Sequence, residues 1–186
     1  MRNKHSCERV IPAGVCLPTK SMARVNDIRF LELPIKKRCL TLKILFVCSG
    51  NTCRSPMAQA MFEKMCSENN IDAECKGAGT VTMTGIPASD SSVEVMSEKG
   101  IDLSDYRSTS IKAVLLDEID LFVPMTYVHA MTLMQLGVPK NKIYLFSRDI
   151  LDPYGHGLDD YRAARDEIAF ELKGLLEFVR DNYKKD

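Results

Sequence analysis

One short segment constrains the fold of this chain more than any other. Residues 42–48, Leu-Lys-Ile-Leu-Phe-Val-Cys, form an apolar, β-prone run, and a cluster of turn-forming residues follows directly at 49–52. Ser55 and Pro56 then supply a helix-capping residue and a proline at the first helical position, where its missing N–H costs nothing. Apolar residues recur at helical spacing from there to about position 69. The segment therefore predicts a strand, a tight loop and a helix in immediate succession.

The same alternation continues along the rest of the chain. Further strands are predicted at 72–78, 119–123 and 142–146, and further helices at 89–99, 126–136 and 159–183. Strands that alternate with helices are typical of a parallel sheet covered by helices on both faces. We therefore predict an α/β fold with a four-stranded parallel sheet. Because ligands of such sheets bind at the carboxyl ends of the strands, the functional site is expected directly after Cys48.

The charge distribution separates the first part of the chain from the rest. The 186 residues carry 25 basic and 25 acidic side chains, but residues 1–43 contain ten basic and three acidic ones, a net +7, which leaves −7 for residues 44–186. This balance argues against a uniformly basic nucleic-acid binder and against a highly charged disordered chain. Residues 1–41 show no sustained apolar period. We expect them to form a basic, disordered extension, or sequence upstream of a misassigned start, and residues 42–186 to form the domain.

The composition also bears on the compartment of the protein. No apolar run approaches the ~18 residues that a membrane-spanning helix needs, and none suited to a secretory signal precedes Arg38. The arginines of residues 1–41 fit a transit peptide, but Glu8, Asp27 and Glu32 count against one. The seven cysteines are an odd number without the spacing of a disulfide framework. We therefore expect a cytoplasmic protein with no membrane partner.

The loop after the first strand has the residues of an anion site. Cys48 and Arg54 are separated by five residues, a spacing that chance alone supplies readily. Their context is more informative, because the cysteine ends a strand and the arginine precedes a helix N-terminus. Gly50 and Asn51 between them allow the loop to wrap with its N–H groups converging. Such a loop is expected to bind a phosphate-like dianion.

The residue types in this loop also predict a nucleophile. N–H dipoles, a nearby arginine and a helix N-terminus all favour the thiolate of Cys48. The guanidinium of Arg54 offers a planar fork of donors for two phosphoryl oxygens, and the Ser55 hydroxyl can bond the thiolate while it caps the helix. Each residue alone has a structural explanation, as a buried thiol, a surface charge and a cap. Their combination in one loop favours catalysis.

Residues 47–58, Val-Cys-Ser-Gly-Asn-Thr-Cys-Arg-Ser-Pro-Met-Ala, resemble the signature of the low-molecular-weight protein tyrosine phosphatase family. The resemblance covers residues 42–184 and continues, in the family's order, through 77–80, 100–103, 120–121 and 152–155. It implies a phosphatase that needs no metal and no cofactor and acts on a phosphorylated protein or peptide through a phosphocysteine intermediate. We expect no nucleic-acid partner and a monomer or weak dimer. Around Cys48 and Arg54, the resemblance implies a phosphate-binding loop made of Ser49, Gly50, Asn51, Thr52, Cys53 and Ser55.

The resemblance also supplies a general acid. It assigns Asp152 to protonate the leaving group from a loop over the site and then to activate water against the phosphocysteine. Pro153 fixes the backbone after it, and Tyr154 resembles the family's aromatic wall for the substrate side chain. The run Asp-Pro-Tyr-Gly by itself is equally typical of an ordinary turn. The catalytic assignment therefore depends on the family's order of motifs.

Two positions depart from the pattern of the tyrosine phosphatases. Gly77 stands where family members often have a serine that helps to hold the loop asparagine, so the support of Asn51, expected in a left-handed conformation, is in question. Thr52 stands where tyrosine phosphatases usually have isoleucine, whereas the protein arginine phosphatases of the same fold resemble this chain in having threonine. Its hydroxyl suits the polar guanidinium side of phosphoarginine. Phosphoarginine and phosphotyrosine both remain open, with Thr52 and the short 152–155 loop favouring phosphoarginine.

Other cysteines and histidines have weaker assignments. Cys53 is either a redox partner that traps oxidised Cys48 as a reversible disulfide or a small buried filler. Cys66 and Cys75 fall on a predicted helix and a predicted strand and suit the core. The histidines lack partners at metal-ligand spacing, so no metal site is predicted.

Functions of other classes remain as alternatives. An arsenate reductase of the same fold would relay the oxidation through two further cysteines, and none follows Cys75. A catalytically silent phosphoprotein-binding module is a second alternative, although Cys48, Arg54 and Asp152 are all present. A nucleotide-binding module fits poorly, because Thr82 stands where a third glycine would be required.

Overall fold

The computed structural model of this chain describes residues 41–183. Apart from Thr41, the predicted N-terminal extension lies outside the described residues, as do residues 184–186. Within the described part, no helix combines the length and the apolar character needed to span a membrane.

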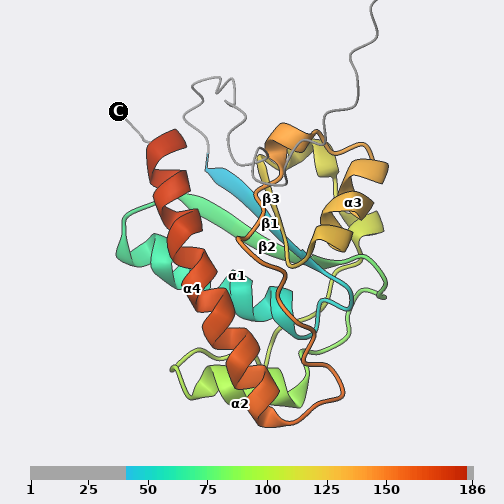
Figure 1. Cartoon of the computed structure of the whole chain (residues 1–186), viewed down its shortest axis with the longest axis vertical. Coiled ribbons are helices and arrows are strands. Elements are labelled where there is room, and N and C mark those ends of the chain that lie inside the picture. The colour runs from blue at the N-terminus through green and yellow to red at the C-terminus, as the bar shows by residue number, and fades with distance from the viewer. Residues whose placement is uncertain (1–40, 184–186) are drawn as a thin grey trace, which may run out of the picture. The chain divides into compact units, whose positions relative to one another are not determined.

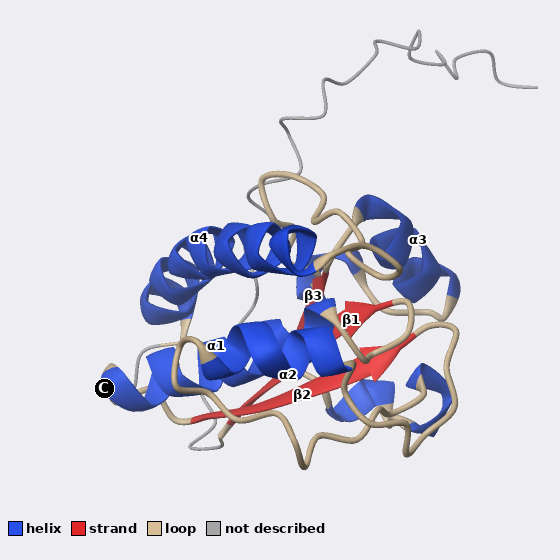
Figure 2. Cartoon of the chain, turned by 90° about the horizontal axis from the view of Figure 1, so that it is seen from below, coloured by secondary structure: helices blue, strands red, loops and turns tan. Residues whose placement is uncertain are grey.

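The core of the fold is a parallel sheet of three strands, β1 (Leu42–Cys48), β2 (Ala73–Gly79) and β3 (Leu121–Pro124), in the order β2-β1-β3. Figure 2 shows β1 between its two neighbours. Cys48 pairs with Gly79 of β2, and Val47 pairs with Pro124 of β3. The carboxyl ends of all three strands therefore meet at one edge of the sheet, directly around Cys48.

The fourth strand predicted at 142–146 is not confirmed. This segment makes one isolated bridge, between Ile143 and Phe122, in which the Tyr144 N–H donates to the Phe122 carbonyl at 2.8 Å. Alternate residues of a strand face the same neighbour, so the next residue of β3 that faces this segment is Pro124. Proline has no N–H to donate, so the ladder ends after one bridge.

Helices cover both faces of the sheet, as predicted. Ile44 and Phe46 of β1 point into a core shared with α1 (Arg54–Glu68), α2 (Asp90–Ser97) and α4 (Leu158–Asn182). Leu45 and Val47, one residue out of phase, point to the opposite face and pack with Leu133 of α3 (Tyr127–Gln135). Figure 1 shows α1 and α4 on one side of the strands and α3 on the other. The α/β prediction is therefore confirmed.

Helix α1 begins two residues earlier than expected. Its first residue is Arg54 and its N-cap is Cys53, which forms no side-chain capping hydrogen bond. The prediction that Ser55 caps this helix is therefore wrong. The first N–H groups of a helix have no acceptor within it, so the start of α1 offers free donors next to Cys48.

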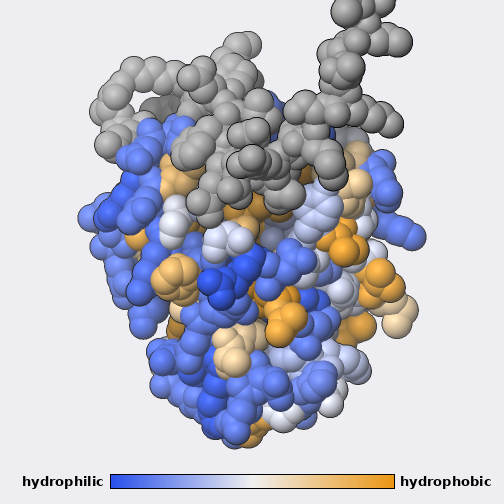
Figure 3. Space-filling model, in the orientation of Figure 1, coloured by the Kyte–Doolittle hydropathy of each residue, from blue (hydrophilic) through white to orange (hydrophobic). Residues whose placement is uncertain are grey.

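The described surface carries scattered rather than continuous apolar groups on the face seen in Figure 3. Hydrophilic side chains predominate there, with small hydrophobic groups between them. Several of the most exposed apolar side chains of the molecule lie on loops that follow strands or precede α4, among them Val81, Met83, Leu151 and Tyr154. These loops lie on the carboxyl side of the sheet, where the sequence predicts the functional site.

Candidate active site

Cys48 is the last residue of β1, and its side chain is 2% exposed. Its Sγ lies 2.9 Å from the Ser55 hydroxyl oxygen and accepts the backbone N–H of Asn51 at 3.2 Å. The sulfur therefore has a hydroxyl and a backbone N–H as neighbours, and both groups can donate to it. The structure thus brings Ser55 to the sulfur, as the sequence predicted.

The loop conformation depends on Asn51, which is fully buried and has a φ of +53°. The left-handed conformation predicted for this residue is therefore confirmed. Its Oδ1 accepts the Thr109 N–H at 2.7 Å, and its Nδ2 donates to the Ser55 hydroxyl at 2.8 Å and to the Tyr106 hydroxyl at 2.7 Å. One amide therefore ties the loop to the start of α1 and to the segment that follows α2.

Tyr106 supplies the support for Asn51 that the sequence left in question. A Cβ atom built on Gly77 would lie 2.3 Å from the Tyr106 hydroxyl and 2.6 Å from Asn51 Nδ2. The tyrosine hydroxyl therefore fills the space in which a side chain at position 77 would stand. Burial raises the pKa of Tyr106, which keeps its phenol protonated. The sequence analysis did not identify Tyr106 as a site residue. The one sign of it in the sequence is the glycine at position 77, which leaves room for a side chain from elsewhere in the chain.

Arg54 is 3% exposed and has an unusual set of partners. Its Nη1 donates to the Ile150 carbonyl at 3.0 Å, and its Nη2 donates to the Ser49 hydroxyl at 3.4 Å and forms an ion pair with Asp152. The Nε is buried and has no hydrogen-bond partner. A buried N–H without an acceptor destabilises the folded protein, so this edge of the guanidinium is suited to bind an acceptor that enters the loop.

Asp152 and Tyr154 lie on the loop between residue 150 and α4. The Asp152 side chain is 47% exposed and reaches Arg54, and its Oδ1 accepts the Tyr154 N–H at 3.3 Å. Tyr154 itself is 72% exposed. The structure therefore brings Asp152, 104 positions after Cys48 in the sequence, to Arg54 of the Cys48 loop, and it leaves Tyr154 exposed two residues further along.

The other loop residues have less direct contacts. The Cys53 Sγ lies 3.4 Å from the hydroxyl of Ser89 and 3.4 Å from that of Tyr161. Thr52 is half-buried, and its hydroxyl lies 3.6 Å from the Cys53 Sγ and 3.3 Å from the position that a Cβ atom on Gly50 would take. Burial raises the pKa of Tyr161 to about 12. These contacts suit Cys53 as a packed side chain, and its redox role stays a prediction.

Comparison with known proteins supports this arrangement. A family model described as "Low molecular weight phosphotyrosine protein phosphatase" matches residues 43–185. The chain belongs to this family. It is therefore a cysteine-dependent protein phosphatase.

Several relatives of the phosphatase carry more specific names. It is 33% identical over 153 residues to a protein-arginine-phosphatase of Bacillus subtilis, a match that covers 78% of this chain and 99% of that protein. It is 36% identical to a protein-arginine-phosphatase of Geobacillus stearothermophilus, with 73% and 94% coverage. A Brevibacillus brevis protein named arsenate reductase is 31% identical over 137 residues, with 72% and 93% coverage.

Solved structures agree with the fold of the phosphatase. A low molecular weight protein tyrosine phosphatase from T. tengcongensis has a TM-score of 0.69 at 35% identity, and the match covers 74% of this chain and 99% of that one. A YwlE arginine phosphatase, a cysteine-to-serine mutant with a phosphorylated active site serine, has a TM-score of 0.71 at 31% identity, with 76% and 98% coverage.

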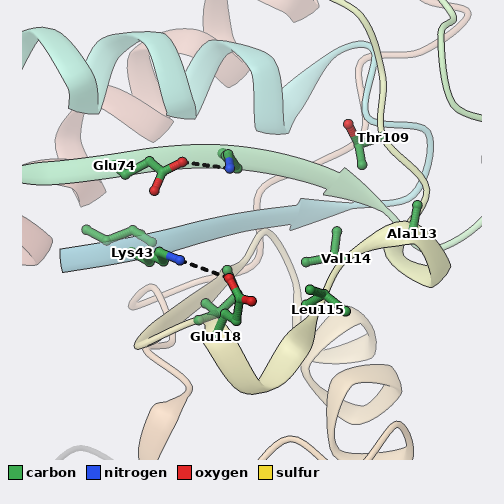
Figure 4. A pocket seen from close by; sticks show the side chains of 10 residues that line it. Lys43, Glu74, Thr109, Ala113, Val114, Leu115 and Glu118 are labelled. Carbon is green, nitrogen blue, oxygen red and sulfur yellow. Dashed lines mark hydrogen bonds and ion pairs between the residues drawn. The ribbon is translucent and has the colours of Figure 1, made fainter. Parts of the chain in front are cut away.

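A separate pocket of about 350 Å³ contains none of the predicted site residues of the phosphatase. It lies beside the first halves of β1 and β2 and is lined in part by Lys43, Glu74 and Glu118 (Figure 4). Lys43 pairs with Glu118 at 2.9 Å and Lys76 pairs with Glu74 at 2.6 Å. Because these charges already compensate one another, the pocket offers no excess charge for a phosphate group.

Residues 41–183 of the phosphatase contain no group of three or more histidine, cysteine or acidic side chains arranged to hold a metal ion. Cys66 and Cys75 are buried in the core, as predicted. His156 lies on the exposed loop before α4. His129, in contrast, is buried next to Ser49, which sequence reasoning did not foresee.

Proposed function

We propose that this phosphatase transfers the phosphoryl group of a phosphorylated protein side chain to Cys48 and then to water. The observation that carries the proposal is the state of Arg54. Its Nε is buried without a partner, and its Nη2 forms an ion pair with the half-exposed carboxylate of Asp152. Two phosphoryl oxygens fit these two nitrogens as a bidentate pair, and the bound group then lies over the nucleophile.

Binding and acid catalysis are linked through the same ion pair. A phosphoryl dianion competes with Asp152 for Arg54 Nη2, because both are anionic acceptors for one donor. The displaced carboxylate takes up a proton from solvent and then donates this proton to the leaving nitrogen or oxygen. The P–N or P–O bond breaks while the Cys48 thiolate forms the S–P bond.

The second step restores the enzyme. Asp152, now a carboxylate, accepts a proton from water, the water oxygen forms a bond to phosphorus, and the S–P bond breaks to release phosphate and the Cys48 thiolate. The N–H donors of the loop and the guanidinium of Arg54 stabilise the charge on the equatorial oxygens throughout. The relative whose active site serine replaces a cysteine and is phosphorylated supports a phosphoryl-enzyme at this position.

We propose phosphoarginine as the substrate side chain. Two relatives at 33% and 36% identity are named protein-arginine-phosphatase, and Thr52 is a half-buried residue of the phosphate-binding loop, next to the residues that would hold the phosphoryl group. A hydroxyl can accept from a guanidinium N–H, whereas an isoleucine side chain cannot, so threonine discriminates in favour of phosphoarginine. Relatives named as protein-tyrosine-phosphatases at 30% and 32% identity make phosphotyrosine the competing substrate.

The test compares kcat/KM of the full chain on a phosphoarginine peptide and on a phosphotyrosine peptide, without metal and with reductant. We expect a preference of roughly a hundredfold for phosphoarginine. Thr52→Val removes the hydroxyl and keeps the shape, and Thr52→Ile adds bulk, so loss of the preference in both variants assigns it to the hydroxyl. A wild-type preference for phosphotyrosine would reduce Thr52 to a packing residue.

The remaining predictions concern the partner, the oligomeric state, the cellular location and the domain limits of the phosphatase. The phosphorylated protein partner follows from the family, whereas the monomeric or weakly dimeric state, the cytoplasmic location and the domain limits of 42–186 stay predictions. We do not propose arsenate reduction, because no cysteine follows Cys75 to relay the oxidation.

A further inference from the structure

A buried histidine stands next to the phosphate-binding loop, and the proposed mechanism does not use it. His129, the third residue of α3, is 5% exposed. Its Nδ1 lies 2.7 Å from the hydroxyl of Thr126, the N-cap of α3, and its Nε2 lies 3.0 Å from the hydroxyl of Ser49. Both ring nitrogens therefore have a hydroxyl partner, and the ring connects α3 to the loop.

The surroundings of His129 keep its ring neutral. Burial and the positive charge of Arg54 lower its pKa to about 4, against the opposing effect of Asp152 and Asp149. The ring also lies in the first turn of α3, where the helix dipole disfavours a cation. A neutral imidazole has one donor and one acceptor nitrogen, so each nitrogen forms a complementary bond with its hydroxyl partner.

Ser49 passes this connection on to Arg54. A guanidinium only donates, so the Ser49 oxygen accepts from Arg54 Nη2 at 3.4 Å on one side and faces the His129 Nε2 on the other. The Ser49 carbonyl also accepts the Val81 N–H at 3.0 Å, which fixes the main chain of this residue. The side chain is thus held between the histidine and the arginine.

This link matters when the ion pair opens. Arg54 Nη2 has two partners, Asp152 and Ser49, and the proposed mechanism removes Asp152 so that it can reach the leaving group. The Ser49 hydroxyl and the Ile150 carbonyl are then the remaining contacts that fix the orientation of the guanidinium toward the incoming phosphoryl group. We propose that His129 is a positioning residue that acts through Ser49 to hold Arg54 in place while Asp152 departs. This inference rests on the proposed function of Arg54 and Asp152.

The test uses variants that remove or keep the link, made in the full chain. His129→Leu removes both hydrogen bonds of the ring at similar side-chain volume. His129→Gln places an amide near the position of Nε2 and keeps the hydrogen bond to Ser49. Ser49→Ala removes the same hydrogen bond from the serine side. The readouts are kcat, KM, the affinity for inorganic phosphate by calorimetry, and the thermal unfolding midpoint. Because the link positions Arg54 for the anion, we expect His129→Leu to lower kcat/KM and phosphate affinity by roughly 10- to 100-fold, and His129→Gln to recover most of both.

A double variant decides whether the two residues act as one unit. If His129 acts through Ser49, the variant with both Ser49→Ala and His129→Leu is no worse than the more affected single variant. Losses that multiply, or a His129→Leu variant with a lower unfolding midpoint but wild-type phosphate affinity, would overturn the inference. If His129→Leu does not fold, His129→Met, which also removes both hydrogen bonds but has a more adaptable side chain, takes its place in the double variant with Ser49→Ala. A wild-type protein that neither binds phosphate nor hydrolyses a phosphopeptide would refute the proposed function itself, whereas an active wild type with an unaffected His129→Leu refutes only the positioning role.

Discussion

The loop of residues 48–55 and the loop of residues 149–157 meet at Arg54 but are restrained to different degrees. In the first loop, Asn51 and Ser55 are fully buried and Arg54 is 3% exposed. In the second, Leu151 is 79% exposed, Tyr154 is 72% exposed, and Asp152 is held mainly by its ion pair with Arg54. The first loop is fixed by several buried hydrogen bonds, whereas the Asp152 carboxylate of the second is held mainly by one contact that a substrate can replace.

This difference assigns different tasks to the two loops. A site that stabilises developing charge has to be in place before the reaction, since reorganisation during the reaction would cost part of the gain. A general acid has to change partners, from the arginine to the leaving group and then to water. The restrained loop therefore suits phosphate binding and the nucleophile, and the exposed loop suits proton transfer.

The largest effect is expected for Cys48→Ser in the restrained loop. A serine hydroxyl is a much poorer nucleophile than a thiolate, so turnover should fall by roughly 10⁴-fold or more. Because the N–H donors and Arg54 are unchanged, inorganic phosphate should still bind, as measured by calorimetry. Retained turnover would remove Cys48 from the mechanism.

The exposed loop is tested by Asp152→Asn. In single-turnover experiments, loss of the general acid should slow release of the leaving group from a phosphopeptide by roughly 10²- to 10³-fold, and from an activated aryl phosphate much less, because a good leaving group needs no proton. Phosphate affinity should stay the same or increase, since the competing carboxylate of the ion pair is gone. Equal losses on both substrates would mean that Asp152 is not the acid.

The support of the restrained loop is tested by Tyr106→Phe. This change leaves one buried N–H of Asn51 without its acceptor, which should destabilise the protein by about 1–2 kcal/mol in urea unfolding and lower kcat/KM by roughly tenfold. The reciprocal change Gly77→Ser should be harmful alone, because its Cβ would lie 2.3 Å from the Tyr106 hydroxyl. In the Tyr106→Phe background the same serine should restore part of the activity. A Tyr106→Phe variant with wild-type stability and activity would show that the hydroxyl does not support the loop.

The last prediction concerns stability alone and changes no catalytic group: His129 gives the restrained side of the site a pH dependence of stability. Its pKa is about 4 in the folded protein, below the ordinary value of 6.5, so the unfolded chain binds more protons between these values. Stability is therefore full above pH ~6.5 and is lost as the pH falls toward 4, by on the order of 2 kcal/mol after solvent screening is allowed for. Urea unfolding at a series of pH values should show this loss in the wild type and a smaller one in His129→Gln. The same slope in both would exclude His129 as its source.

Most helices and strands could be predicted from the sequence, because the apolar residues of successive segments follow the spacing of a strand or of a helix clearly. All the predicted helices are present within one to two residues at each end, and the strands of the central sheet lie where the apolar runs predicted them. The predicted fourth strand is not confirmed, because apolar periodicity carries no information on which backbone groups of a neighbouring strand are available for hydrogen bonds. The proline at 124, on the face of β3 turned toward residue 143, was the sign that the ladder would stop.

The site was predictable where chemistry and loop geometry reside in one segment, and not where distant residues complete it. Cys48, Asn51 and Ser55 come together within eight positions, so local turn propensities were enough to relate them. Tyr106 and His129 reach the loop from other elements, and neither has a motif of its own in the sequence. Their contacts depend on helix positions and on the space at Gly77, which only the folded chain defines.

The most direct test of the account is to trap the phosphoryl-enzyme. Asp152→Asn, mixed with an activated aryl phosphate and quenched with acid, should accumulate the intermediate, because leaving-group departure needs no acid while hydrolysis of the S–P bond lacks its base. Peptide mass spectrometry should then find the phosphoryl group on Cys48, and Cys48→Ala combined with Asp152→Asn, which has no nucleophile at this position, serves as the control. A phosphoryl group on another residue, or continued turnover with no phosphoryl-enzyme at any quench time, would contradict the account.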